Sequence, residues 1–315
     1  MYKLSETGPA FCVCAGGMSV YIMYRVDLLT SLVTLVFAVL FLTFCTFVLS
    51  RCGSPRFDSA AVKAIAGIYA LISAAVSVTL SASLVTDGGM MDKSFYPLLI
   101  LLTGLFAVCF GMSNRSATVS VSFITAVICA VAMAVLMLLC LLRTDFSVPK
   151  ISSPQPALFL LLFAFSVCDT VLVLPLIRGK PAMVFTGGIL AHLYAFGMTV
   201  TALSVLSESV FKDSNMPWLT LWRSTFITSF LNSFEIIGIC AFFILNAVKA
   251  GIAANLAFEV FGKRYAVFIM LAVFCISVLL TLFSGFIYAA AAVSVFFALF
   301  ITAYSLKNKK DCPNQ

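Results

Sequence analysis

The stretch ATVSVSFITAVICAVAMAVLMLLCLL, residues 117–142, carries no charged side chain and decides the class of fold. About 20 consecutive apolar residues are enough for an α-helix to cross the hydrocarbon core of a bilayer. Comparable runs occur along the rest of the chain, separated by short segments that hold most of the charges and turn residues. We therefore predict an all-α, polytopic membrane protein with ten transmembrane helices, at 8–24, 27–50, 60–84, 95–113, 117–142, 156–176, 182–206, 218–248, 264–284 and 286–306.

The composition of the whole chain favours the same class. Hydrophobic residues make up 63% of the 315 residues, charged residues only 10%, and the mean hydropathy is +1.15. Soluble domains are about 45–50% apolar and about 25% charged, so the excess apolar surface must face lipid. This excludes a small soluble enzyme, a nucleic-acid-binding domain and a disordered chain.

The eleven cysteines fall mostly inside apolar runs, and their spacing resembles neither a zinc site nor a disulfide framework. We interpret them as small buried hydrophobic residues. The chain also lacks a nucleophile elbow, a phosphate-binding loop and a cluster of metal ligands. We expect no enzyme activity, no catalytic residue, no metal and no cofactor.

The lysines and arginines predict the orientation in the membrane. If the N-terminus is cytoplasmic, thirteen of the 19 lie in cytoplasmic segments, five lie in outer segments, and Arg223 lies within a span. Positive charge accumulates on the cytoplasmic side of membrane proteins, so both termini are predicted to be cytoplasmic. Trp218 and Trp222 then stand at the outer mouth of the eighth span, where an aromatic belt is expected.

The spans form two groups of five within a single transmembrane domain, residues 1–315. The first group fills 8–142, the second fills 156–306, and the Pro-rich segment 143–155 separates them. An odd number of spans in each group gives the two halves opposite orientations, as in the inverted repeats of secondary transporters. In such folds the first helix of each half is usually broken and the substrate binds at the break.

The first and sixth spans contain candidate breaks. The first is short and contains Gly16, Gly17 and Met18, which indicate either a weak point in the helix or close packing against a neighbour. The sixth contains Ser166, Cys168 and Asp169. A carboxylate within an apolar span is costly, which favours a functional role over contact with lipid headgroups.

The eighth span carries a polar stripe that includes Asn232, Glu235, Asn246 and Lys249. Glu235 is expected near the middle of the membrane, either facing a water-filled path or hydrogen-bonded to a neighbouring helix. Arg223 would lie about 18 Å from it along one straight helix, too far to pair. His192, the only histidine, is interpreted as either a structural residue or a proton relay.

Three segments resemble the B subunits of spore germination receptors, the endospore germination permeases. The stretch MPWLTLWR at 216–223, followed by FLNSFE at 230–235, resembles their eighth helix. Phe163 through Asp169 to Pro175 resembles their sixth, and Tyr96 through Gly111 to Arg115 resembles their fourth span and the following loop. The chain differs in having Ser233 where the family usually has arginine and Asp169 where it usually has glutamate.

The resemblance implies a ten-helix, five-plus-five fold of the APC superfamily of amino-acid permeases. It also implies a receptor subunit that senses a small germinant beside a larger A subunit and a lipoprotein C subunit in the spore inner membrane. A proton-coupled carrier of amino acids or related metabolites and a non-binding assembly scaffold are the alternatives. An amino acid and a nucleoside both remain possible ligands. We predict that the ligand contacts Gly16, Gly17, Met18, Ser166, Cys168, Asp169, Asn232 and Glu235.

Overall fold

A computed structural model describes residues 5–52, 59–142, 155–176, 182–206, 208–224, 234–283 and 285–308. These ranges contain helices and short connections, without a strand. The main helices are α2 (Thr7–Gly17), α3 (Ser19–Met23), α4 (Leu28–Cys52), α5 (Ala60–Asp87), α6 (Tyr96–Gly111), α7 (Arg115–Leu141), α8 (Pro156–Leu162), α9 (Ala182–Val205), α12 (Phe234–Phe261), α13 (Ala266–Leu282) and α14 (Phe286–Asn308). Shorter elements are η1 (Lys93–Phe95), η2 (Phe163–Val167), η3 (Cys168–Leu176), α10 (Glu208–Asp213), α11 (Pro217–Arg223) and η4 (Lys263–Tyr265).

Nine helical segments in the described part of the chain are long and apolar enough to cross a membrane. They correspond to the second through tenth predicted spans, so the chain is a multi-pass membrane protein. The predicted first span corresponds to α2 and α3, which together form a shorter apolar segment, Thr7–Met23. The number of spans and the inverted repeat remain predictions.

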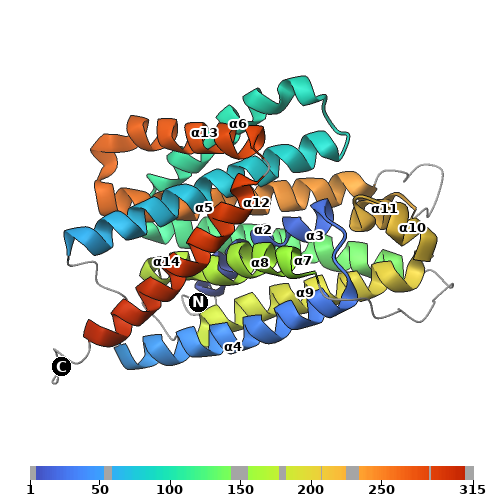
Figure 1. The fold of residues 1–315 in the computed structure, drawn as a ribbon, viewed down its shortest axis with the longest axis horizontal. Helices are drawn as coiled ribbons and strands as arrows, with labels where there is room; N and C mark the ends of the chain where they lie inside the picture. The colour runs from blue at the N-terminus through green and yellow to red at the C-terminus, as the bar shows by residue number, and fades with distance from the viewer. Residues whose placement is uncertain are drawn as a thin grey trace.

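The bundle has a polar, small-residue centre and an apolar rim. Almost all of α2 and α3 is buried, and α5 and α12 are largely buried, whereas α4, α6, α7 and α13 expose many leucine, valine and phenylalanine side chains. Figure 1 shows α5 and α12 running side by side, with α6 and α13 on one side and α4 and α9 on the other. Small residues allow the central helices to approach closely, while the rim residues suit contact with lipid.

The prediction of one continuous eighth span at 218–248 is wrong. Residues 217–223 form the helix α11, and the described part of α12 runs from Phe234 to Phe261. Arg223 and Glu235 are twelve positions apart, yet Nε of the first lies 4.0 Å from Oε1 of the second, which one straight helix does not allow. The side chain of Ser224 donates to the carbonyl of Leu221 at the end of α11. Of the predicted polar stripe, Glu235, Asn246 and Lys249 lie on α12, and Asn232 lies outside the described residues. Lys249 is among the thirteen lysines and arginines that the predicted topology counts as cytoplasmic, but it is fully buried inside the bundle.

The interpretation of Trp218 and Trp222 as a lipid-facing belt is also wrong. Their exposed fractions are only 2% and 1%. Trp218 stacks on Tyr21 of α3, and Trp222 stacks on Phe242 of α12, with ring centroids 5.4 and 6.4 Å apart. The absence of a side chain at Gly238 makes room for Trp222, because a Cβ there would lie 2.3 Å from its ring. The tryptophans thus join α11 to the centre of the bundle.

The predicted orientation has a direct test in cysteine labelling. The ends of α3 and α5 lie at the same end of the bundle as α10 and α11 (Figure 1), which is the predicted outer side. We expect Asp87→Cys to react with a membrane-impermeant maleimide added to intact cells, and Lys263→Cys in η4 to react only after the membrane is opened. The parent chain gives the background from its own cysteines. The opposite pattern of labelling would show that the protein has the reverse orientation in the membrane.

Candidate functional site

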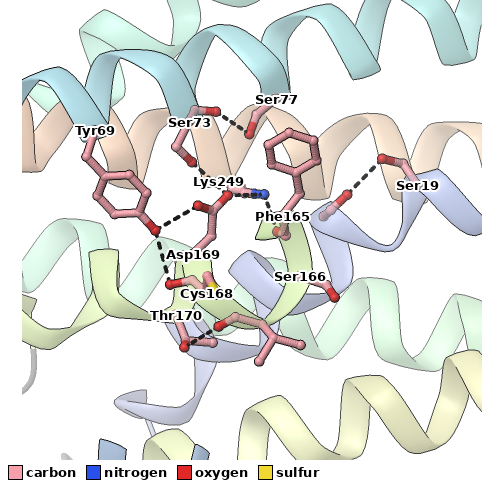
Figure 2. A network of polar contacts seen from close by, with 12 residues as sticks. Ser19, Tyr69, Ser73, Ser77, Phe165, Ser166, Cys168, Asp169, Thr170 and Lys249 are labelled. Carbon is pink, nitrogen blue, oxygen red and sulfur yellow. Dashed lines mark hydrogen bonds and ion pairs between the residues drawn. The ribbon is translucent and has the colours of Figure 1, made fainter. Parts of the chain in front are cut away.

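The centre of the bundle contains a fully buried ion pair. Asp169 lies in the first turn of η3 and Lys249 lies near the middle of α12, and neither side chain has any exposed surface. The Lys249 Nζ atom is 2.7 Å from the Asp169 Oδ2 atom, as Figure 2 shows. Burying two charges is costly unless they pair closely and their remaining hydrogen-bonding positions are satisfied.

Helix α5 satisfies the remaining positions of the carboxylate. The Tyr69 hydroxyl lies 2.8 Å from Asp169 Oδ1, and the Ser73 hydroxyl donates to Oδ2 at 2.8 Å. The Tyr69 oxygen is also 3.0 Å from the carbonyl of Cys168. Lys249 donates in addition to the carbonyl of Phe165. The pair therefore connects α5, α12 and the sixth span in one network (Figure 2).

The sixth span leaves α-helical geometry where it meets this network. Helix α8 ends at Leu162, η2 is a π-helical turn, and η3 is 3₁₀-helical. Single π turns within helices often occur at functional sites. Within this irregular segment the Phe165 carbonyl accepts a hydrogen bond from Lys249. The sixth span is therefore irregular where the sequence predicted a break, although its residue before Asp169 is Cys168 and not a glycine.

The first span is interrupted at Met18, between α2 and α3. The chain also packs very closely at this point, so both interpretations of the sequence hold. A Cβ at Gly17 would lie 2.0 Å from the Phe165 carbonyl oxygen, and one at Gly16 would lie 3.1 Å from the Leu245 carbonyl oxygen on α12. The two glycines thus allow the first span to touch the sixth and eighth spans directly.

The structure brings together most of the predicted ligand-binding residues. Gly16, Gly17 and Met18 lie against the segment that contains Ser166, Cys168 and Asp169. All six are buried, and Ser166 donates to the carbonyl of Leu162 at 2.5 Å. Asn232 lies outside the described residues. Their contact with a ligand remains a prediction.

Glu235 lies at the start of the described part of α12 and not in the middle of a span, contrary to the prediction. It stands in the first turn of α12, and its Oε1 atom is 4.0 Å from Arg223 Nε at the end of α11. Arg223 also donates to the carbonyl of Gly88, just after α5, at 2.7 Å. The predicted separation of Glu235 from Arg223 assumed one straight helix, which the structure does not have. The Oε2 atom of Glu235 is buried without a hydrogen-bond partner among the described residues.

His192 has the contacts of a structural histidine. Its Nδ1 atom donates to the Gly188 carbonyl at 2.8 Å, and its Nε2 atom is 3.2 Å from the Ser166 hydroxyl. These contacts join α9 to the sixth span. They also occupy both ring nitrogens, which favours the structural interpretation over a proton relay.

Three residues of the site, Tyr69, Ser73 and Lys249, were not predicted from the sequence as part of it. A signal for the first two exists, because Tyr69, Ser73, Ser77 and Ser81 recur every four residues and so lie on one face of a helix. The described residues contain no group of three or more histidine, cysteine, aspartate or glutamate side chains placed to hold a metal ion.

Comparison with known proteins adds no support to the resemblance found in the sequence. No protein-family model matches the chain, and no curated protein matches it. The resemblance to germination permeases therefore rests on the three sequence segments alone.

Proposed function

We propose that the chain is the membrane subunit of a spore germinant receptor, which senses a small solute through a transporter-like pocket. In this proposal it functions in the spore inner membrane, with both termini cytoplasmic, beside a larger A subunit and a lipoprotein C subunit. The ten spans form a five-plus-five inverted repeat, and the solute binds where the first, sixth and eighth spans meet. The three sequence segments that resemble the germination permeases support the family.

The observation that carries the proposal is the Asp169–Lys249 pair at the junction of two irregular helices. The pair is buried, and hydrogen bonds from Tyr69 and Ser73 to the carboxylate and from Lys249 to the Phe165 carbonyl accompany it. A change in the angle between the sixth and eighth spans would alter the distance between Lys249 and the Phe165 carbonyl, against which Gly17 of the first span packs. The junction therefore has the character of a two-state element, which a bound solute can bias if it prefers one arrangement.

A proton-coupled carrier of amino acids or related metabolites is the second candidate, and the Asp169 carboxyl itself favours it. Such a carrier must expose a titratable group to each side of the membrane in turn. In the described arrangement Asp169 has no exposed surface, and Lys249, Tyr69 and Ser73 surround its carboxylate. This arrangement suits a receptor, in which the pair stays closed until the solute binds.

The test is to delete the gene and return variants to the same strain. We expect Lys249→Gln and Asp169→Asn to lower the rate of germinant-triggered germination by at least about tenfold, the effect of losing about 1.4 kcal/mol of coupling. Lys263→Gln and Asp92→Asn are the matched exposed controls and should respond normally. Immunoblots of the inner membrane check that each variant accumulates.

Two results would contradict the proposal. A deletion strain that germinates normally with every germinant would exclude the receptor function. Uptake of an amino acid into vesicles that is driven by a pH gradient and lost in Asp169→Asn would instead support the carrier.

A further inference from the structure

A cleft of about 510 Å³ opens at the predicted outer end of the bundle, away from the buried ion pair. It lies between the end of α5, the start of α6, the end of α13, the start of α14 and the end of the first span. Small-molecule sites commonly have volumes of about 300–1,000 Å³. The cleft therefore has room for a small solute together with water.

Opposite charges stand together in the wall of the cleft. Asp87, the last residue of α5, and Lys93, the first residue of η1, both line it, and Lys93 Nζ is 3.3 Å from Asp87 Oδ1. The exposed fractions of the two side chains are 36% and 84%. Exposed ion pairs of this kind are weakly held, so a ligand can separate them at little cost.

The polar part of the lining consists of hydroxyl groups from three helices. The Tyr96 hydroxyl oxygen of α6 lies 3.0 Å from Ser83 Oγ of α5 and 3.2 Å from Thr281 Oγ1 of α13. Hydroxyl groups both donate and accept hydrogen bonds. Apolar side chains, including Met23 and Ile287, complete the lining. Uncharged polar groups and small apolar groups can therefore both be accommodated.

We infer that this cleft is a second binding site, apart from the one proposed at the junction of the first, sixth and eighth spans, and that it takes a small zwitterion of the free amino-acid class. The ammonium group of the ligand pairs with Asp87, and its carboxylate pairs with Lys93. One exposed ion pair is thereby exchanged for two. A neutral nucleoside would gain nothing from this pair of charges, and a simple cation or anion would engage only half of it.

The cleft is also connected to the central site through the first span. Met23 and Tyr24 line the cleft and end the segment that begins at Ser19, directly after the interruption at Met18. Gly17, on the other side of the interruption, approaches the Phe165 carbonyl to which Lys249 donates. A ligand that contacts Tyr24 therefore acts on the same span that contacts the buried pair.

The test uses purified full-length protein in detergent and three forms of one side chain. The twenty free amino acids are screened by isothermal titration calorimetry, and the best ligand is then compared with its amide, which is a cation, and its N-acetyl derivative, which is an anion. We expect the zwitterion to bind best. Asp87→Asn should lower the affinity for the zwitterion and for the cation about tenfold and leave the affinity for the anion unchanged. Lys93→Gln should lower the affinity for the zwitterion and for the anion and leave the affinity for the cation unchanged.

Asp92→Asn and Lys263→Gln are the controls, because these charges do not line the cleft. The inference is overturned if none of the twenty amino acids binds, or if both cleft variants bind all three forms as the parent protein does. Binding of uridine in the absence of binding by any amino acid would likewise overturn the inference and favour a nucleoside as the ligand. These measurements are independent of germination: charge-selective binding in a protein whose deletion leaves germination unchanged would uphold the cleft and reject the receptor function.

Discussion

Replacing Lys249 with methionine is expected to destabilise the protein severely. The substitution keeps the length of the side chain but leaves the Asp169 carboxylate buried without its cation. Removal of one partner from a buried ion pair typically costs about 3–5 kcal/mol. We expect a large fall in the monodisperse fraction on size-exclusion chromatography and in the thermal unfolding midpoint of the purified protein.

A second substitution separates the loss of the pair from the loss of packing. Asp169→Asn combined with Lys249→Met removes both charges and leaves an amide whose oxygen can accept from one of the Tyr69 and Ser73 hydroxyls and whose NH₂ group can donate to the other. The double variant should therefore be more stable than Lys249→Met alone. Lys263→Met, at an exposed lysine, should change stability by less than about 0.5 kcal/mol. A Lys249→Met protein that unfolds at the parent temperature would show that the pair does not hold the bundle together.

The second large effect is expected at Gly17, where even alanine is too large. Its methyl group would lie 2.0 Å from the Phe165 carbonyl oxygen and 2.7 Å from the Ser166 Cα atom. These are backbone atoms, so no side-chain rotation relieves the clash, and the first and sixth spans must separate. Overpacking of this kind typically costs about 1–3 kcal/mol. We expect Gly17→Ala to lower the unfolding midpoint and Gly17→Leu to lower it further.

The matched control for Gly17 is Gly104 in the middle of α6. A Cβ at Gly104 would meet no atom within 4 Å, and alanine favours a helix over glycine by about 1 kcal/mol. Gly104→Ala should therefore leave the unfolding midpoint unchanged or raise it. If Gly17→Ala behaves like Gly104→Ala, the first span does not depend on close contact with the sixth.

Hydropathy was sufficient to place most of the helices, because a membrane span requires a long apolar run with clear ends. Leu28–Cys52 and Phe286–Asn308 lie within two residues of their predicted boundaries. The prediction of one straight eighth span failed because the sequence remains apolar across 218–248, although Arg223 and Glu235 come within 4.0 Å of each other. Hydropathy measures the preference for an apolar environment and does not report where a helix ends inside it.

The central site was only half predictable. Asp169 was conspicuous because a carboxylate is rare in an apolar run, and adjacent glycines marked the first span. Tyr69 and Ser73 are ordinary residues in membrane helices, and only their contact with Asp169 distinguishes them. Lys249 was assigned to a loop because the predicted span ended one residue before it. Pairings between distant residues depend on how the helices pack, which a single sequence does not specify.

The position of the two tryptophans gives the protein a built-in optical reporter. Trp218 and Trp222 are the only tryptophans in the chain, and both are buried against aromatic rings of α3 and α12. Their combined emission therefore arises from one place, where the outer half of the first span meets the eighth. Any tilting of α3 changes the stacking of Tyr21 on Trp218, and with it the intensity and wavelength of the fluorescence. Movement of the first span can thus be followed in the unlabelled protein, in real time, without a dye or an added cysteine.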